Sequence, residues 1–143
     1  MIHAESIEQR AYVAWARMSK AARYVFAVPN GGKRNVREAA RLKSEGVLAG
    51  VPDILLPVPA GTCSGLFIEF KSWPNKLTTS QSVVISELVE RGYCCVVAYS
   101  AESAIKVTTD YLAGKLTPTL MVVGMATPAR SHQPAPAGQT SAR

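Results

Sequence analysis

The chain has 143 residues, of which 48% are hydrophobic and 18% are charged, and its formal net charge at pH 7 is +6. That length suits one domain with a buried core, and no apolar run approaches the roughly 20 residues that cross a bilayer, so we expect no membrane association. The opening MIHAESIEQR lacks the charged-then-apolar order of a signal peptide, so we expect a cytoplasmic protein.

The first 33 residues predict a helix, a strand and a turn. Apolar side chains recur at helical spacing over residues 5–19, which predicts an amphipathic helix. Residues 23–29, RYVFAVP, are rich in β-branched and aromatic residues and end at a proline, so they predict a strand. NGGK, at residues 30–33, has the chemistry of a turn because Asn and Gly tolerate positive φ.

A second helix is expected between Asn35 and Gly46. Asn35 is a suitable N-cap, Glu38 stands three positions later as in a capping box, and Gly46 supplies a C-terminal stop. Two strands are expected next, at 52–57 and 65–71. The turn-rich PAGTCSG between them predicts a hairpin.

The next part of the chain predicts two helices on either side of a buried strand. Thr78 and Gln81 form a capping-box pattern, and the helix that they begin ends at Gly92. The continuously apolar YCCVVAY at 93–99 predicts a central strand. Ser100 is then expected to cap a last helix, AESAIKVTTDYLAG.

The order of these elements predicts an α/β domain in which helices flank a mixed sheet. LTPTLMVVG, at 116–124, is expected to form either a late edge strand or part of an oligomer contact. We place the domain at residues 1–125, because residues 126–143 are rich in Pro, Ala and Ser and predict a disordered tail. The three cysteines lack the spacing of a zinc site and are expected to be small buried hydrophobes.

Charged residues border the two strands of the predicted hairpin. Asp53 opens the first strand after a tight entry at Gly50 and Pro52. Glu69 and Lys71 lie two apart on the second, so their side chains share one face. Two carboxylates beside one ammonium suit a hard divalent cation and a phosphate. From these residues alone, a cross-strand salt bridge is the alternative.

The same residues belong to a longer motif. GVPDILL followed by LFIEFK resembles the PD-(D/E)XK nuclease signature. PNGGKRNVREAARLKSEGVLAGVPD and KLTTSQSVVISELVERGYCCVVAYSAESAI resemble the VRR-NUC branch of these nucleases, in the compact stand-alone form found in phages and bacteria. The resemblance covers roughly residues 5–112 and implies a restriction-endonuclease-like mixed sheet flanked by helices.

The resemblance also implies a metal-dependent active site. Asp53 and Glu69 would ligate Mg²⁺ or Mn²⁺, Phe70 would add its backbone carbonyl, and Lys71 would be the catalytic lysine. The family carries a further metal-site glutamate on its first helix. Glu5 fits that position by pattern, and Glu8 fits by its angular position on the helix. Alternatively, both are first-turn acids that the helix dipole favours.

Two polar residues match the family but also have structural explanations. Gln81 matches a glutamine that would lie near the metal and the substrate phosphate, although its capping box explains it equally well. Asn30 belongs to the family's NGG turn, whose backbone N–H groups would meet phosphate, although a turn alone explains it.

Nine of the 16 basic residues lie within the first 43 positions, which suits either nucleic acid or a solubilising surface. The densest cluster is Lys33, Arg34, Arg37, Arg41 and Lys43. We expect Arg34, Arg37 and Arg41 to fall on one helical face that follows a DNA backbone. A solvated helix face is the alternative.

Together, these residues and the resemblance imply a metal-dependent, structure-selective DNA endonuclease. Stand-alone relatives are associated with branched DNA such as four-way (Holliday) junctions, which implies a homodimer acting in a bacterial or phage-infected cell. The alternatives are a flap or nicking nuclease, a non-catalytic DNA-binding module on the same fold, and an interaction protein with structural salt bridges.

Overall fold

The structure is a computed structural model that describes residues 3–30 and 34–126. In chain order its elements are α1 (Ala4–Met18), β1 (Phe26–Ala27), α2 (Val36–Ser44), β2 (Ile54–Leu56), β3 (Leu66–Phe70), α3 (Thr79–Glu90), β4 (Cys94–Ala98), α4 (Ala101–Leu112) and β5 (Leu120–Val123). The predicted α/β fold is confirmed. The predicted hairpin is also confirmed, because β2 and β3 pair antiparallel.

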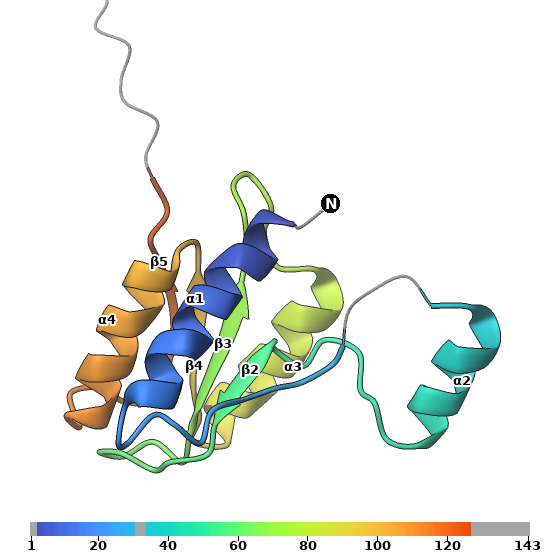
Figure 1. Cartoon of the computed structure of the whole chain (residues 1–143). Helices are drawn as coiled ribbons and strands as arrows, with labels where there is room; N and C mark the ends of the chain where they lie inside the picture. The colour runs from blue at the N-terminus through green and yellow to red at the C-terminus, as the bar shows by residue number, and fades with distance from the viewer. Residues whose placement is uncertain (1–2, 31–33, 127–143) are drawn as a thin grey trace, which may run out of the picture.

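The five strands form one mixed sheet in the order β1-β2-β3-β4-β5. The first three strands pair antiparallel, and β4 and β5 continue the sheet in parallel with β3. Helices α3 and α4 supply the crossovers that parallel pairing requires. Helices α1 and α4 cover one face of the sheet, and α3 covers the other (Figure 1).

Alternation along β3 divides its side chains between two cores. Leu66, Ile68 and Phe70 pack with α1 and α4, whereas Phe67 packs with Ile85 of α3. Across the larger core, the Tyr12 hydroxyl of α1 is hydrogen bonded to the Thr108 hydroxyl of α4 at 2.8 Å. The odd positions of β3 therefore face α3, which decides where Glu69 points.

The strand predicted at 23–29 is much shorter in the structure, where only Phe26–Ala27 pairs with β2. The residues ahead of it turn instead of extending. Val25 N donates to Ala22 O, and the Arg17 guanidinium donates to the carbonyls of Arg23 and Val25. These bonds use backbone groups that a longer strand would need.

Helix α2 stands apart from the layered body (Figure 1), and none of its residues is buried. The Asn35 side chain accepts from Glu38 N at 2.8 Å, so the predicted N-cap is confirmed. The cap also corrects one prediction. Arg34 lies ahead of the helix and does not share a helical face with Arg37 and Arg41.

At the C-terminal side, the expected edge strand within 116–124 is confirmed as β5, which pairs parallel to β4, and an oligomer contact there stays a prediction. All three cysteines are buried, as predicted. Apart from Ala126, the predicted tail lies outside the described residues. None of the helices within the described ranges has the length and hydropathy needed to cross a membrane.

Candidate active site

Glu69 and Lys71 project together from the end of β3 toward the α3 side of the sheet. Lys71 Nζ lies 3.3 Å from Glu69 Oε1, and the Glu69 residue is only 4% exposed. Lys71 N donates to Ala98 O, so the backbone keeps its sheet pairing one residue past β3. The period-two alternation of a strand therefore places both groups as predicted.

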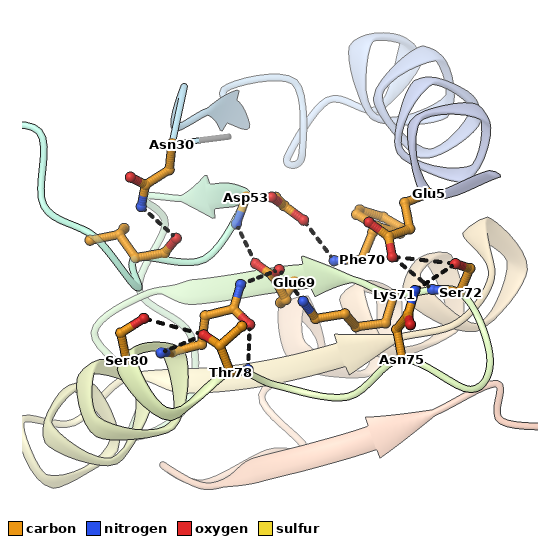
Figure 2. A network of polar contacts seen from close by, with 12 residues as sticks. Glu5, Asn30, Asp53, Glu69, Phe70, Lys71, Ser72, Asn75, Thr78 and Ser80 are labelled. Atoms are coloured by element: carbon orange, nitrogen blue, oxygen red, sulfur yellow. Dashed lines mark hydrogen bonds and ion pairs between the residues drawn. The ribbon is translucent and has the colours of Figure 1, made fainter. Parts of the chain in front are cut away.

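Asp53 is joined across the hairpin to Glu69 and to Phe70 by two hydrogen bonds (Figure 2). Asp53 N donates to Glu69 Oε2 at 3.1 Å, and Phe70 N donates to Asp53 Oδ2 at 2.9 Å. Each carboxylate is thus held by the backbone of the opposite strand. Two acids that would repel in open solution are fixed side by side.

Gln81 both completes the capping box of α3 and contacts a carboxylate of the site. Its side-chain oxygen accepts from Thr78 N and its backbone N donates to the Thr78 hydroxyl, which completes the predicted capping box. Its Nε2 donates to Glu69 Oε1 at 2.8 Å. The cap at the start of α3 therefore orients the Glu69 carboxylate.

The structure separates the two candidate glutamates of α1. Glu5 Oε1 accepts from the backbone N and the hydroxyl of Ser72, next to Lys71 (Figure 2). Glu8 Oε2 accepts from Ala101 N at the start of α4, away from the pair of acids. Glu5 is the helix glutamate that faces the site, and Glu8 caps another helix.

Burial raises the pKa of both central carboxyls. The pKa of Glu69 rises to about 7, first through desolvation and then through the charge of Asp53, while Lys71 opposes the rise. The pKa of Asp53 also rises with burial, against the Phe70 N–H and Lys71, and Glu5 adds to the rise. The pocket also holds three acids, Glu5, Asp53 and Glu69, against the single ammonium of Lys71 among the described residues that line it.

A single pocket of about 350 Å³ collects these groups, with Glu5, Asp53, Glu69 and Lys71 among its lining residues. Among the described residues, no three acidic, histidine or cysteine side chains converge into a ready-made metal cluster. Asp53 and Glu69 supply two carboxylates that line the same pocket. Mg²⁺ commonly binds through one or two carboxylates and keeps several waters. The donor set and its excess negative charge therefore fit a hard divalent cation.

Asn30 and Gly50 hold the chain that enters this site. Asn30 Nδ2 donates to Leu48 O at 2.7 Å and to Val51 O at 3.0 Å. Gly50 has φ +94° and packs against the Ser80 carbonyl at the start of α3, where a Cβ would collide. The tight entry predicted at Gly50 is confirmed. The Asn30 side chain connects the segment after β1 to the loop before β2, and the rest of the predicted NGGK turn lies outside the described residues.

The predicted basic cluster divides into different environments. Arg41 is paired with Glu45 of the same helix at 2.8 Å, and Arg34 donates to Pro29 O at 3.2 Å. Arg37 and Lys43 are exposed. Lys33 and the glycines of the NGG turn lie outside the described residues.

Comparison with known protein families matches the VRR-NUC domain over residues 2–102, a range that includes every residue of the pocket. The chain belongs to the VRR-NUC domain family. Its structure is similar to a solved VRR-NUC domain protein with a TM-score of 0.67 and 28% identity, over 85% of this chain and 94% of the other. No match was found among curated proteins. The VRR-NUC domain is a nuclease-type domain, and this membership implies binding to DNA.

Sequence reasoning missed one residue of the VRR-NUC site, Ser72. Its backbone N and hydroxyl fix Glu5, and Asn75 Nδ2 in turn donates to the Ser72 hydroxyl at 3.4 Å. The only sequence signal was a small polar residue directly after Lys71. A partner 67 positions away along the chain gives no periodic pattern.

Changing Gly50 to alanine is expected to destabilise the fold by about 2–5 kcal/mol. Alanine is strained at the positive φ of this position, and its Cβ would collide with the backbone carbonyl of Ser80. The change should also reduce cleavage, since Asp53 follows three residues later. Gly46→Ala is the matched control, because Gly46 has φ +104° and nothing within 4 Å of an added Cβ. Gly46→Ala should lower the free energy of unfolding, measured with urea, by only about 1–2 kcal/mol. Equal losses in the two variants would mean that the Ser80 contact is unimportant.

Proposed function

We propose that this VRR-NUC domain is a metal-dependent DNA endonuclease of the PD-(D/E)XK type. The observation that carries the proposal is the buried pair of Asp53 and Glu69 with Lys71 beside it in one pocket. Such a net negative pocket is poorly suited to a phosphodiester unless a cation enters with it. The phage and bacterial stand-alone type stays a prediction from the resemblance, and the cytoplasmic location stays a prediction from the sequence of the first ten residues.

In this proposal Asp53 and Glu69 hold Mg²⁺ or Mn²⁺ with the Phe70 backbone carbonyl, and Glu5 lies on the α1 side. When bound, such a cation neutralises phosphate charge and lowers the pKa of a water ligand. Lys71 Nζ orients the attacking water or stabilises charge that develops on the phosphate. Gln81 keeps the Glu69 carboxylate in place through its 2.8 Å hydrogen bond.

We further propose that the enzyme selects branched DNA by shape and phosphate contacts. Such recognition needs no reading of base edges. A four-way junction has two equivalent cutting positions, which favours a homodimer. The β5 edge supports this assembly, because Leu120 and Val122 remain 42% and 53% exposed there. Light scattering should then give twice the chain mass of 15.3 kDa.

The test is cleavage of labelled four-way junction, flap, nicked and plain duplex DNA with Mg²⁺, Mn²⁺ or EDTA. We expect cutting that requires metal and is fastest on the four-way junction. Preference for the flap or nicked DNA would replace the junction assignment and keep the nuclease. DNA binding without cutting of any substrate in either metal would reject the nuclease in favour of a non-catalytic DNA-binding module.

A further inference from the structure

A second groove continues from the active-site pocket toward α2. The two hollows share Asn30 and Ala49, so they meet at the loop that leads into β2. Asn30 lines both hollows, and its side chain is bonded to Leu48 O and Val51 O. It fixes one wall of the groove relative to the chain that carries Asp53.

The groove is positively charged where the active-site pocket is negatively charged. Arg34 and Lys43 line it, and no acidic side chain does so among the described residues. Neither cation takes part in an ion pair within the described ranges, whereas Arg41 is held by Glu45 outside the groove. Two unpaired cations in one groove favour an anionic partner that extends past the active site.

Apart from Asn30 and the two cations, the described residues that line the groove are apolar, and α2 lacks packing that would explain its position. Leu42 of α2 and Leu48 of the following loop line the groove, and Leu48 is 60% exposed. A nine-residue helix that buries no residue gains little stability from the protein's own core. A partner with both phosphates and apolar sugar faces would supply the missing contacts.

We propose that this groove binds the nucleic-acid backbone on one side of the scissile phosphate, with Arg34 and Lys43 each contacting a phosphate. The inference rests on the proposed function, because it takes the Asp53–Glu69–Lys71 pocket as the cleavage position. It distinguishes among the basic residues near α2. Arg34 and Lys43 bind the strand that runs out of the active site, and the Glu45-paired Arg41 does not.

The first test measures equilibrium binding of a labelled four-way junction and a duplex in EDTA, so that nothing is cut. Arg34→Ala/Lys43→Ala should weaken binding and make the slope of log affinity against log salt shallower by about 1.8, from two lost phosphate contacts. Lys43→Ala alone should make the slope shallower by about half as much, because it removes one phosphate contact. The control is Lys106→Ala/Lys115→Ala, which removes the same charge from exposed positions on and after α4. An unchanged slope in the groove variant, or an equal change in the control, would overturn the proposal.

The second test places the groove relative to the cut. Single-turnover cleavage is measured on DNA whose strand is shortened in steps on either side of the cut. Shortening on one side should slow the wild type several-fold and leave the groove variant unaffected, because its contacts there are already gone. Equal sensitivity of both proteins on both sides would overturn the proposal and leave the nuclease intact. If the wild type cuts nothing, the nuclease fails separately, and the salt slopes still decide whether the groove binds DNA.

Discussion

Replacing Lys71 with alanine is expected to lower the cleavage rate by about two to three orders of magnitude while DNA binding stays within a few-fold of wild type. Lys71 is the one cation among the described residues that line the active-site pocket, and its side chain is only 10% exposed. Its loss removes the positive charge at the reacting phosphate. Single-turnover kinetics with saturating protein separate this loss of chemistry from any loss of binding.

Under the proposed function, the lysine variant should still bind a divalent cation. Removing an ammonium that opposes the charge of Asp53 and Glu69 leaves the pocket more negative, so calorimetry should show Mn²⁺ binding at least as tight as in the wild type. Lys76→Ala is the control, because Lys76 lies in the loop after β3 and outside the active-site pocket. Cleavage at the wild-type rate by Lys71→Ala would remove the lysine from the mechanism.

The second large effect is a pH dependence of stability in metal-free protein. The pKa of Glu69 is about 7 in the folded state against 4.5 ordinarily, so the folded state binds its proton more tightly than the unfolded state does. That contribution to stability is fully present below about pH 4.5 and is lost as pH rises through 7. The loss is up to about 3 kcal/mol, because the carboxylate is then charged and buried.

Urea unfolding in EDTA between pH 5 and 8 measures this loss. Glu69→Gln should flatten the slope of stability against pH, because the amide does not titrate. Asp110→Asn should leave the slope unchanged, since the ordinary pKa of this carboxyl, 3.8, is already below that range and its hydrogen bond to Lys106 lowers the pKa further. Added Mg²⁺ should stabilise the wild type more at pH 8 than at pH 5.5, because the cation competes with the proton. Identical slopes in wild type and Glu69→Gln would contradict the assigned burial of Glu69.

The placement of Asp53, Glu69 and Lys71 was predictable because it follows from the local geometry of one strand and one hairpin. Side chains two apart on a strand share a face, and a short hairpin returns the chain beside itself, so Asp53, Glu69 and Lys71 had to meet. The N-cap at Asn35 and the capping box at Thr78 were equally local. Predictions of side-chain placement and helix caps that depend only on short-range backbone geometry are therefore confirmed in the structure.

Features that depend on distant partners were harder to predict. Glu5 and Glu8 lie almost one turn apart on α1, and only the positions of Ser72 and the α4 N-terminus separate their roles. β1 is short because its partner β2 has only three residues and Arg17 holds the preceding turn. The helical face assigned to Arg34 was wrong, because an N-cap one residue later excludes it from α2.

The measurement that tests the central claim most directly is cleavage of one labelled four-way junction by wild type and Asp53→Asn, first with Mg²⁺, then after EDTA, then after Mg²⁺ is restored. The account predicts that the wild type cuts the junction with Mg²⁺, stops after EDTA and cuts again when Mg²⁺ is restored. Asp53→Asn should stay folded and bind the junction but cut it under none of these conditions. Cutting that persists in EDTA, or cutting by Asp53→Asn at the wild-type rate, would contradict the assignment of this pocket as a metal-dependent nuclease centre.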